Sequence, residues 1–482
     1  NILWSGLLVF MPVTSMPLVA ALISSGTTVA SPAGVFLFGL VLVWLIPLIF
    51  KGLTFPRQML PLFVFVLYAV FTTLLSFYYV TPPYKAESPL RNSLEAFITL
   101  MIGICFYLVV SVWINDREKL KYTIRLINWS GLLMLIWAGV QAGAWYLWHQ
   151  YPTWMRDFNE LYSVGPLYRQ RVSGFALEPS WFAHQLNMLY LPLWLALSIN
   201  RYSAHRFKFL KISFENILLL GGFIALFLSY SRVGLAAFLL MVAYVVLRVN
   251  LNLINILQRI VSGSGWERVR KISPRILALV IGTFLFAAYL GILYGLAVGL
   301  SRVDPRMAGL FEFDINRPDA VMYYANQLTF ASRLVYWQAG WELFNQHPWL
   351  GAGLGKAGFY LHTYLSSYAW RLMEVRDLVY RSSSALNIKS LWVRLLAESG
   401  IVGFSIFVAW LWNLWRETYK IDHINDALTK SVVWMGRFVI IGLIIEGFSV
   451  DTFALPYLWV SLGILTASVE WMSIKKVKEV SS

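Results

Sequence analysis

The sequence predicts an all-α integral membrane protein with about twelve transmembrane helices and one long polar loop late in the chain. Hydrophobic residues make up 59% of the 482 residues and charged residues only 13%, whereas a soluble protein would carry about 25% charge. The apolar residues also gather in runs of about 20, the length that crosses the hydrocarbon core of a bilayer. Because the chain begins with Asn1 rather than Met, we expect a short piece to precede it.

Two polar segments interrupt the regular succession of spans. A medium loop covers residues 150–179, and a much longer, partly helical loop covers 301–390, between the ninth and tenth spans. We therefore divide the chain into spans one to nine (1–300), the long loop (301–390), and spans ten to twelve with the tail (391–482). The apolar runs are 3–23, 34–50, 60–80, 94–114, 124–148, 181–199, 217–229, 233–247, 276–300, 391–415, 432–448 and 455–471.

Lys and Arg alternate between the loops. The even-numbered loops and the tail are rich in them, while the odd short loops hold few. The positive-inside rule then places both termini in the cytoplasm and the loops 150–179 and 301–390 on the outer side. The formal charge of +15 fits such cytoplasmic anchoring. It does not indicate a nucleic-acid partner, because the chain shows no basic amphipathic module.

Cations on the outer side need a separate explanation. Long loops escape the positive-inside rule, so a loop arginine such as Arg333 is either part of a solvated, salt-bridged surface or part of a ligand site. Arg232 differs because it lies between two short apolar runs, where a charge is costly and usually functional. Arg171 and Lys389 also stand at the ends of the two outward loops.

Glu178 stands just before the sixth span, at the outer edge of the membrane. Pro179 fits the first turn of a helix. Glu178 is therefore either a helix-start residue favoured by the helix dipole or a base that faces an outward cavity. Ser180, His184 and Asn187 share one face of the following helix and are candidates to line that cavity, although a lone histidine is more often a packing residue.

An aromatic-rich stretch in the long loop shows helical spacing from Leu334 through Trp337 to Phe344. Arg333 and Tyr336 share another face of this helix. Such a helix would lie on the outer membrane surface with its apolar stripe down. Its tryptophans are then either interfacial anchors or rings that stack on sugars.

The glycine run 351–355 gives a weak signal. No strand precedes it and no acidic partner follows at dinucleotide spacing, so a Rossmann interpretation fails. The glycines either allow a tight turn or present backbone amides to a phosphate. Further on, Arg394 and Glu398 are spaced i to i+4 and are expected to pair within the tenth span. The single Cys105 excludes an internal disulfide and a thiolate metal cluster.

Three stretches of the late loop and the following helix resemble a known family. They read RLVYW at 333–337, HPWLGAGLG at 347–355 and LLAESGIVG at 395–403. Together they look like the signature of the O-antigen ligase and Wzy-type polymerase superfamily. Residues 171–180 and the pair Ser231-Arg232 also resemble it, as do the span number and the long late loop. The resemblance covers most of the chain, and the late loop and its exit helix are the specific part.

The resemblance implies a GT-C-type membrane glycosyltransferase of the bacterial inner membrane. Such enzymes take a glycan from undecaprenyl diphosphate on the periplasmic face and pass it to an acceptor hydroxyl, inverting the anomeric centre without a metal or another cofactor. The implied partners are the undecaprenyl diphosphate-linked oligosaccharide, membrane lipid and an acceptor glycan, either a growing polysaccharide or lipid A-core. A chain-length regulator follows from the resemblance alone.

One departure bears on the acceptor. Ligases of this family carry a histidine-asparagine pair at the start of the exit helix, and this chain has Lys389 and Ser390 there. A histidine base at that position is therefore absent. The run from Glu178 to Ser180 resembles the variant found in polymerases of exported polysaccharides. We expect polymerisation of O-antigen or exopolysaccharide repeat units, with O-antigen ligation to lipid A-core as the alternative.

The leaving diphosphate decides the expected roles of the cations. Its charge grows as the glycosidic bond breaks, and fixed cations lower that barrier. The planar fork of arginine binds phosphate oxygens in pairs. We assign Arg232 and Arg333 to the diphosphate, with Arg171 and Lys389 as helpers.

The acceptor hydroxyl loses a proton as it attacks, so a base is expected nearby. Glu178 is the first candidate, with His362 and His184 behind it. Tyr336 and Trp337 are expected to contact the substrate.

Two other classes compete with this interpretation. A flippase or transporter would use Arg232 as a counter-charge, but transporters often show internal repeats, and the two halves of this chain show none. A peptidoglycan polymerase of the shape, elongation and division type would carry shorter outward loops and a different acidic motif.

Overall fold

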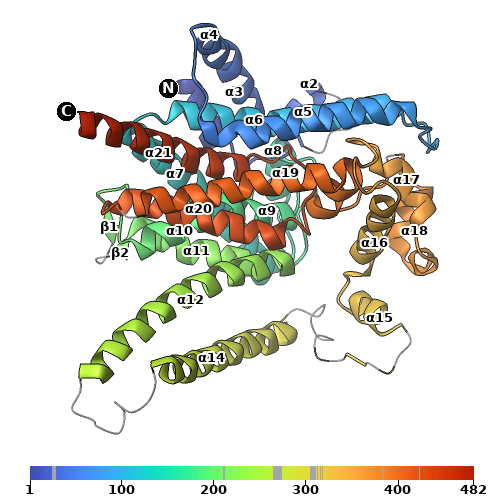
Figure 1. Ribbon diagram of the computed structural model, residues 1–482. Helices are drawn as coiled ribbons and strands as arrows, with labels where there is room; N and C mark the ends of the chain where they lie inside the picture. The colour runs from blue at the N-terminus through green and yellow to red at the C-terminus, as the bar shows by residue number, and fades with distance from the viewer. Residues whose placement is uncertain are drawn as a thin grey trace.

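The computed structural model describes residues 1–23, 29–209, 212–263, 274–303, 311, 313–314, 316, 319–383, 385–422 and 424–481. Within these ranges the protein is a bundle of long helices, with a cluster of short helices at one end (Figure 1). Eight of the described helices are long and apolar enough to cross a membrane. The prediction of an all-α integral membrane protein is therefore confirmed, while the total of twelve spans stays a prediction.

The first part of the chain builds one side of the bundle. Its segments begin at prolines in several places, as expected for a residue whose missing N–H is not needed in the first helical turn. The elements are α1 (Ile2–Val9), α2 (Pro17–Ile23), α3 (Pro32–Leu40), the π-helical turn η1 (Val41–Leu45), α4 (Ile46–Phe50), η2 (Arg57–Met59), α5 (Leu60–Leu75), η3 (Ser76–Tyr78), α6 (Pro89–Trp113), α7 (Arg117–Trp148) and α8 (Thr153–Tyr162).

The middle of the chain continues the bundle and adds a small hairpin. The elements are α9 (Pro179–Gln185), the π-helical turn η4 (Leu186–Tyr190), α10 (Leu191–Ile199), the antiparallel strands β1 (Lys208–Phe209) and β2 (Ile212–Ser213), α11 (Phe214–Leu228), α12 (Arg232–Gly263) and α14 (Pro274–Val303). The strands pair Lys208 with Ser213 and Phe209 with Ile212.

The last part holds the short helices and three long ones. The short elements are α15 (Ala320–Gln327), α16 (Ala331–Gln346), α17 (Ala357–Tyr364), η6 (Ser367–Arg371) and α18 (Met373–Tyr380). The long helices are α19 (Leu391–Ile421), α20 (Ala427–Glu446) and α21 (Pro456–Ser481). We call residues 319–383 and 385–390 the α15–α18 segment. The predicted loop residues 304–310, with Arg306, and Arg317 lie outside the described residues.

The first predicted span is not one continuous helix. Residues 3–23 form α1 and α2 with non-helical chain between them. Pro12 and Pro17 lack the N–H that would continue a helix. Between them, Ser15 forms β-bridges with Ala30 and with Ser163. The run is apolar as expected, but its two prolines break the single helix that its length predicts.

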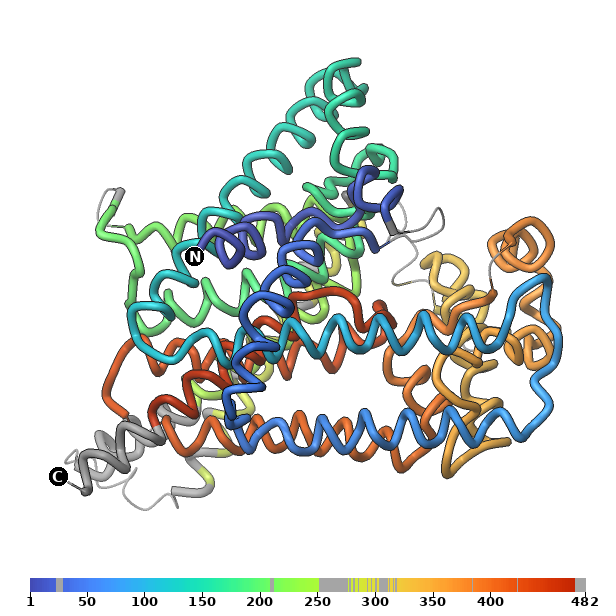
Figure 2. Tube along the Cα trace, turned by 90° about the horizontal axis from the view of Figure 1, so that it is seen from above, coloured from blue at the N-terminus to red at the C-terminus, as the bar shows by residue number. Residues whose placement is uncertain are grey.

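The α15–α18 segment has a hydrophobic core of its own, which includes Val335, Leu343, Phe359 and Val375. It lies at the end of the bundle away from both chain termini (Figure 1). The loop between α5 and α6 reaches it (Figure 2), where Lys85 Nζ donates to the oxygens of Leu378 (2.7 Å) and Ser382 (2.6 Å) near the end of α18.

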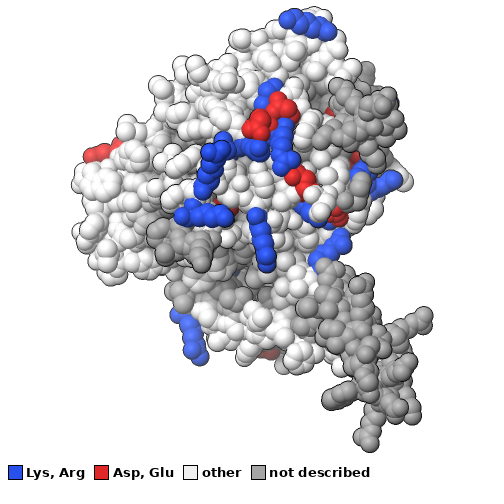
Figure 3. Space-filling model, turned by 90° about the vertical axis from the view of Figure 1, so that its left-hand side faces the viewer, with Lys and Arg blue, Asp and Glu red and all other residues white. Residues whose placement is uncertain are grey.

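The end of the bundle that carries the termini has a different surface. Seen from that side, Lys and Arg side chains form most of its charged surface, with fewer Asp and Glu between them (Figure 3). This is the distribution that the loop charges led us to expect for one end of the molecule.

The glycine run joins the α15–α18 segment to a break in α19. Gly400 has φ +62° and ψ −173° within α19, and Ile401 N donates to Pro348 O at 2.8 Å. The amides of Ala352 and Gly353 donate to the carbonyls of Ala397 (2.9 Å) and Glu398 (3.0 Å). The run therefore serves as a close backbone junction. These amides are engaged within the protein, so the alternative of a phosphate cradle is not supported.

Candidate active site

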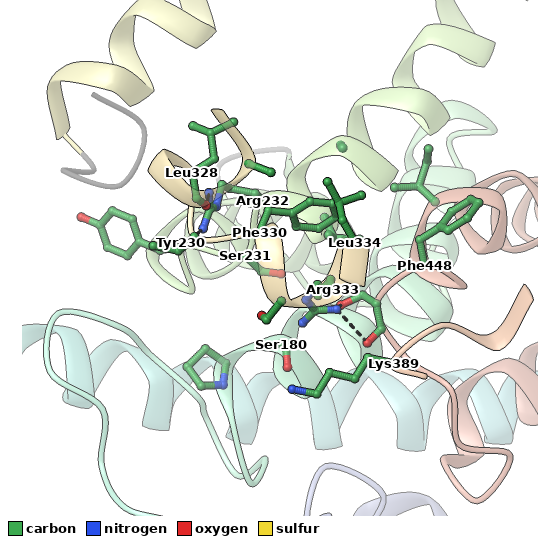
Figure 4. A pocket seen from close by; sticks show the side chains of 18 of the residues that line it. Ser180, Tyr230, Ser231, Arg232, Leu328, Phe330, Arg333, Leu334, Lys389 and Phe448 are labelled. Carbon is green, nitrogen blue, oxygen red and sulfur yellow. Dashed lines mark hydrogen bonds between the residues drawn. The ribbon is translucent and has the colours of Figure 1, made fainter. Parts of the chain in front are cut away.

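A cavity of about 870 Å³ lies where the α15–α18 segment meets the bundle. Its wall combines the loop before α9, the start of α12, the helices α15, α16 and α18, the start of α19 and the chain after α20 (Figure 4). The lining residues are Tyr168, Arg171, Glu178, Pro179, Ser180, Tyr230, Ser231, Arg232, Val233, Ala236, Val321, Tyr324, Ala325, Leu328, Thr329, Phe330, Ser332, Arg333, Leu334, Trp337, Glu374, Lys389, Ile445, Phe448 and Ser449.

Arg232 enters the cavity from the first residue of α12. The chain reverses between α11 and α12 through Tyr230, which has φ +49°, a strained value for a residue with a side chain. The guanidinium of Arg232 donates to the carbonyl of Leu328 and, at 2.6 Å, to the hydroxyl of Thr329. Arg232 thus connects the bundle to the α15–α16 turn, where Thr329 also has a positive φ of +51°.

Arg333 enters from the first turn of α16. Its Nη1 donates to the carbonyl (3.2 Å) and the hydroxyl (3.1 Å) of Ser449, which follows α20 (Figure 4). Both acceptors on Ser449 are neutral, so these bonds do not cancel the charge of the Arg333 guanidinium. A side chain held in this way is positioned to meet an anion without first having to be ordered.

Lys389 and Arg171 complete the cationic lining. Lys389 has φ +57°, and its amide donates to Asn387 Oδ1 (2.8 Å) and Asp451 Oδ2 (3.2 Å). Its ammonium group pairs with Glu374 of α18. Arg171 Nε donates to the carbonyl of Ser229 at 3.0 Å.

The charge balance of the lining is positive. Among the described residues it holds four cations and two acids, Glu178 and Glu374. Backbone strain gathers here as well, because Tyr230, Thr329 and Lys389 all have positive φ. Strain of this kind persists where the surrounding structure over-determines it, often at functional sites. The cavity is suited to a ligand that carries more than one negative charge.

Glu178 lies at the wall of the same cavity. It precedes α9 at the N-cap position but makes no side-chain capping bond to that helix. Its carboxylate instead accepts a hydrogen bond from the Ser180 hydroxyl. Burial raises the pKa of the Tyr168 phenol, and nearby Glu178 raises it further, against the opposing effect of Arg171. Glu178 therefore combines a position at the start of a helix with access to the cavity.

Six of the nine residues selected from the sequence line this cavity: Glu178, Arg232, Arg333, Arg171, Lys389 and Trp337.

The other three residues do not line it. His184 is 5% exposed, and its Nδ1 lies 3.3 Å from Glu446 Oε2, inside the bundle. His362 stacks on Tyr84 with ring centroids 4.7 Å apart, in the core of the α15–α18 segment. Tyr336 is fully buried in that core. The expectation that His184 and Asn187 share a cavity face with Ser180 is wrong, since Asn187 Nδ2 donates to Glu446 at 2.7 Å.

Several lining residues were not selected from the sequence. These include Glu374, Ser449 and Tyr168. They lie far apart along the chain, and none belongs to a local motif, so no spacing signal could have grouped them. Among the described residues, no three His, Cys, Asp or Glu side chains come together as a metal site would require.

Comparison with known proteins bears on the same region. Residues 217–408 match the family model described as O-antigen ligase. This match supports the resemblance to the O-antigen ligase and Wzy-type family that the sequence motifs carry. The match contains Arg232, Arg333 and Lys389 and the whole α15–α18 segment, while Glu178 lies before it. Members of this family are membrane glycosyltransferase-like enzymes that act on lipid-linked glycans and acceptors. A search of curated proteins finds no match to this chain.

Proposed function

We propose that this O-antigen ligase family member is an inverting, metal-independent glycosyltransferase that uses undecaprenyl diphosphate-linked glycan as its donor. It polymerises O-antigen or exopolysaccharide repeat units on the outer face of the inner membrane. The observation that carries this proposal is the cavity itself. Four cations line it together with Glu178, whose carboxylate accepts from the Ser180 hydroxyl, and these residues lie within or next to the matched family region.

The orientation belongs to the same proposal. The α15–α18 segment, which forms part of the cavity wall, lies at the end of the bundle opposite the cation-rich end (Figures 1 and 3). If the cationic end faces the cytoplasm, the cavity and the α15–α18 segment face the periplasm and both termini are cytoplasmic. This placement puts the donor site on the side where the lipid-linked glycan is polymerised.

The diphosphate binds between Arg232 and Arg333. Each guanidinium approaches from a different wall, and each is already fixed by bonds to carbonyl or hydroxyl oxygens. As the bond between the anomeric carbon and the phosphate oxygen breaks, negative charge grows on the leaving diphosphate. Preorganised cations stabilise that charge more in the transition state than in the ground state. Arg171 and Lys389 add to the same field.

Glu178 acts as the base. Its carboxylate accepts from the Ser180 hydroxyl and faces the cavity on the side of Tyr168 and Arg171. The acceptor hydroxyl binds between Glu178 and the anomeric carbon. Its oxygen forms the new glycosidic bond as its proton passes to Glu178 and the diphosphate leaves. Attack opposite to the leaving group inverts the anomeric centre.

The lipid and the glycan occupy different sides of the cavity. Val233 and Ala236 of α12 and Ile445 and Phe448 at the end of α20 contribute apolar side chains to the lining. This apolar side suits the first isoprene units of the carrier. Trp337, in the α16 wall, offers a ring to the sugar, because an aromatic face packs against the apolar face of a pyranose.

The alternative function is ligation of O-antigen to lipid A-core. Lys389 and Ser390, in place of the histidine-asparagine pair of ligases, favour polymerisation. A transporter of lipid-linked glycan remains the competing class.

The test is product formation by the purified protein. The protein is incubated with lipid diphosphate-linked repeat units alone, and then with lipid A-core added, and the products are resolved on a gel. Arg232→Ala and Arg333→Ala should each lower the rate about 10²–10³-fold, and Glu178→Gln about 10²–10⁴-fold. Arg381→Ala, at an exposed ion pair at the end of α18, and Glu342→Gln, at a half-buried position of α16 outside the cavity lining, are the matched controls.

Each outcome separates the candidates. A ladder from repeat units alone, lost in the two arginine variants, supports the polymerase. Transfer only after lipid A-core is added identifies a ligase. No glycosidic bond under either condition leaves transport as the function. Full activity in Glu178→Gln removes that residue as the base in either enzyme.

A further inference from the structure

Glu374 is the acid of the cavity that the proposed reaction does not use. It lies on α18, and its carboxylate pairs with the ammonium group of Lys389. The two side chains are 47% and 31% exposed, so solvent reaches the pair. Glu178, the other acid of the described lining, instead accepts from Ser180 and lies beside Tyr168. The two acids therefore have different surroundings in one cavity.

The carboxylate of Glu374 is held by more than one donor. Burial acts to raise its pKa, but Lys389, the Ser332 hydroxyl and the charge of Arg333 outweigh burial and lower the pKa. We call Lys389, Ser332 and Arg333 the anion subsite. An ammonium, a hydroxyl and a guanidinium are the donors that bind phosphate oxygens in proteins. Here the ammonium group of Lys389 pairs with the carboxylate of Glu374, and Ser332 and Arg333 line the same cavity.

We propose that the anion subsite binds one phosphate of the donor diphosphate and that the carboxylate of Glu374 fills this subsite while the cavity is empty. This inference rests on the proposed function, which supplies the diphosphate. It adds Glu374 as a residue that competes with the donor for the subsite, and it assigns Ser332 as a phosphate ligand. Glu374 forms no bond to the substrate and transfers no group.

Lys389 and Arg333 of the anion subsite are also held by bonds that do not involve Glu374. The amide of Lys389 is held by Asn387 and Asp451, and Arg333 is held by Ser449. Neither bond set includes Glu374. The backbone of Lys389 and the guanidinium of Arg333 therefore keep their places when the carboxylate leaves, and an incoming phosphate finds them ordered.

The exchange needs only a change in the side chain of Glu374. The far end of α18 is fixed by Lys85, which donates to the carbonyls of Leu378 and Ser382. Half-exposed ion pairs contribute up to about fivefold to an equilibrium. A diphosphate carries more charge and more acceptor oxygens than a carboxylate, so it can displace Glu374, whereas weaker anions compete less well.

The same competition acts on the product. After glycan transfer, the carrier diphosphate keeps both phosphates and most of its contacts in the site. Return of Glu374 to the anion subsite opposes this product and favours its release. Glu374 thus lowers the affinity for both donor and product. This weaker binding favours turnover, because binding substrate and product equally tightly does not raise kcat.

The test measures binding of two diphosphates to the full-length protein in detergent. Inorganic pyrophosphate and farnesyl diphosphate are titrated at fixed pH and ionic strength. Glu374→Gln keeps the size of the side chain and removes its charge. We expect it to bind both probes about fivefold more tightly than the wild type, since the ion pair need not be broken and the repulsion between two anions is gone.

Two variants make the result specific. Asp377→Asn removes a charge one turn away on α18, where Asp377 pairs with Arg381, and should leave both affinities unchanged. In the double variant Glu374→Gln with Lys389→Met, the gain should disappear, because the subsite has lost its ammonium group. Equal elution and thermal midpoints of all variants establish that each is folded.

The outcomes distinguish this inference from the proposed function. Tighter binding in Glu374→Gln alone supports it. If the wild type binds and Glu374→Gln binds equally or more weakly, the competition is refuted and the donor site stands. If neither protein binds either diphosphate, the anion subsite and the proposed donor are refuted together. Tighter binding of pyrophosphate but not of farnesyl diphosphate refutes the assignment to a lipid-linked donor.

Discussion

The substitution Gly400→Ala gives the sharpest test of the junction between the glycine run and α19. In an ordinary helix interior this change stabilises a protein by about 1 kcal/mol. Gly400, however, has φ +62° and ψ −173°, a conformation that residues with a side chain adopt at a cost of about 1–3 kcal/mol. The added Cβ would also lie 2.3 Å from the oxygen and 2.4 Å from the carbonyl carbon of Trp349.

Those atoms belong to backbone that cannot move freely, because Ile401 N bonds to Pro348 O at 2.8 Å. Overpacking of this kind costs about 1–3 kcal/mol more. We therefore expect Gly400→Ala to lower the free energy of unfolding by about 2–6 kcal/mol. Thermal unfolding in detergent, at one scan rate for all variants, measures this as a lower midpoint.

The control is Gly139→Ala in α7. Nothing lies within 4 Å of a Cβ built at Gly139, and the residue lies in a regular helix. This variant should match or slightly exceed the wild-type midpoint. If Gly400→Ala behaves like Gly139→Ala, the break in α19 and the junction built on it are wrong.

Three further predictions concern buried charge and the cavity. Lys356 is fully buried, its Nζ lacks a hydrogen-bond partner among the described residues, and burial lowers its pKa from 10.5 to about 8. Lys356→Met should raise the thermal midpoint at pH 7. The lysine of the unfolded chain binds its proton more tightly than the buried lysine does, so the wild type gains stability as the pH rises from about 8 to 10.5. The stability advantage of the variant should therefore shrink over that range. An advantage that stays constant with pH would contradict this reasoning. Glu446→Ala should lower the unfolding free energy, measured by denaturation, by about 2–4 kcal/mol, because it leaves Asn187 and His184 without their shared buried partner. A change under 1 kcal/mol would argue against tight contact among these three side chains. Arg232→Lys should lower the transfer rate about tenfold or more, since an ammonium group cannot reproduce the paired bonds of a guanidinium; an unchanged rate would show that only the charge matters.

The sequence was informative where a local pattern has one structural meaning. Apolar runs of spanning length predicted the fold class. The polar interruption at 230–232 correctly predicted the turn between α11 and α12. The i to i+4 spacing of Arg394 and Glu398 predicted their ion pair, which the structure shows at 2.9 Å. The cost of a charge between apolar runs selected Arg232, which does line the cavity.

The sequence failed where the partner of a residue lies far along the chain. His184 was placed in the cavity by its helix face, but Glu446, 262 residues away, holds it inside the bundle. Tyr336 and Trp337 are neighbours on α16, which carries apolar residues around its circumference. Periodicity placed Trp337 on the apolar stripe and Tyr336 on another face, whereas the structure turns Tyr336 into the core and Trp337 toward the cavity.

The wall of the cavity has a consequence for how the protein is made. Its lining begins at Tyr168 and ends at Ser449, and Ser449 supplies both acceptors that hold Arg333. During synthesis, α12 and α16 emerge from the ribosome long before the end of α20. A nascent chain therefore cannot assemble the complete wall until nearly all of it has been translated. Chains that stop before Ser449 lack the acceptors for Arg333, so the complete wall of the cavity can form only after α20 has been made.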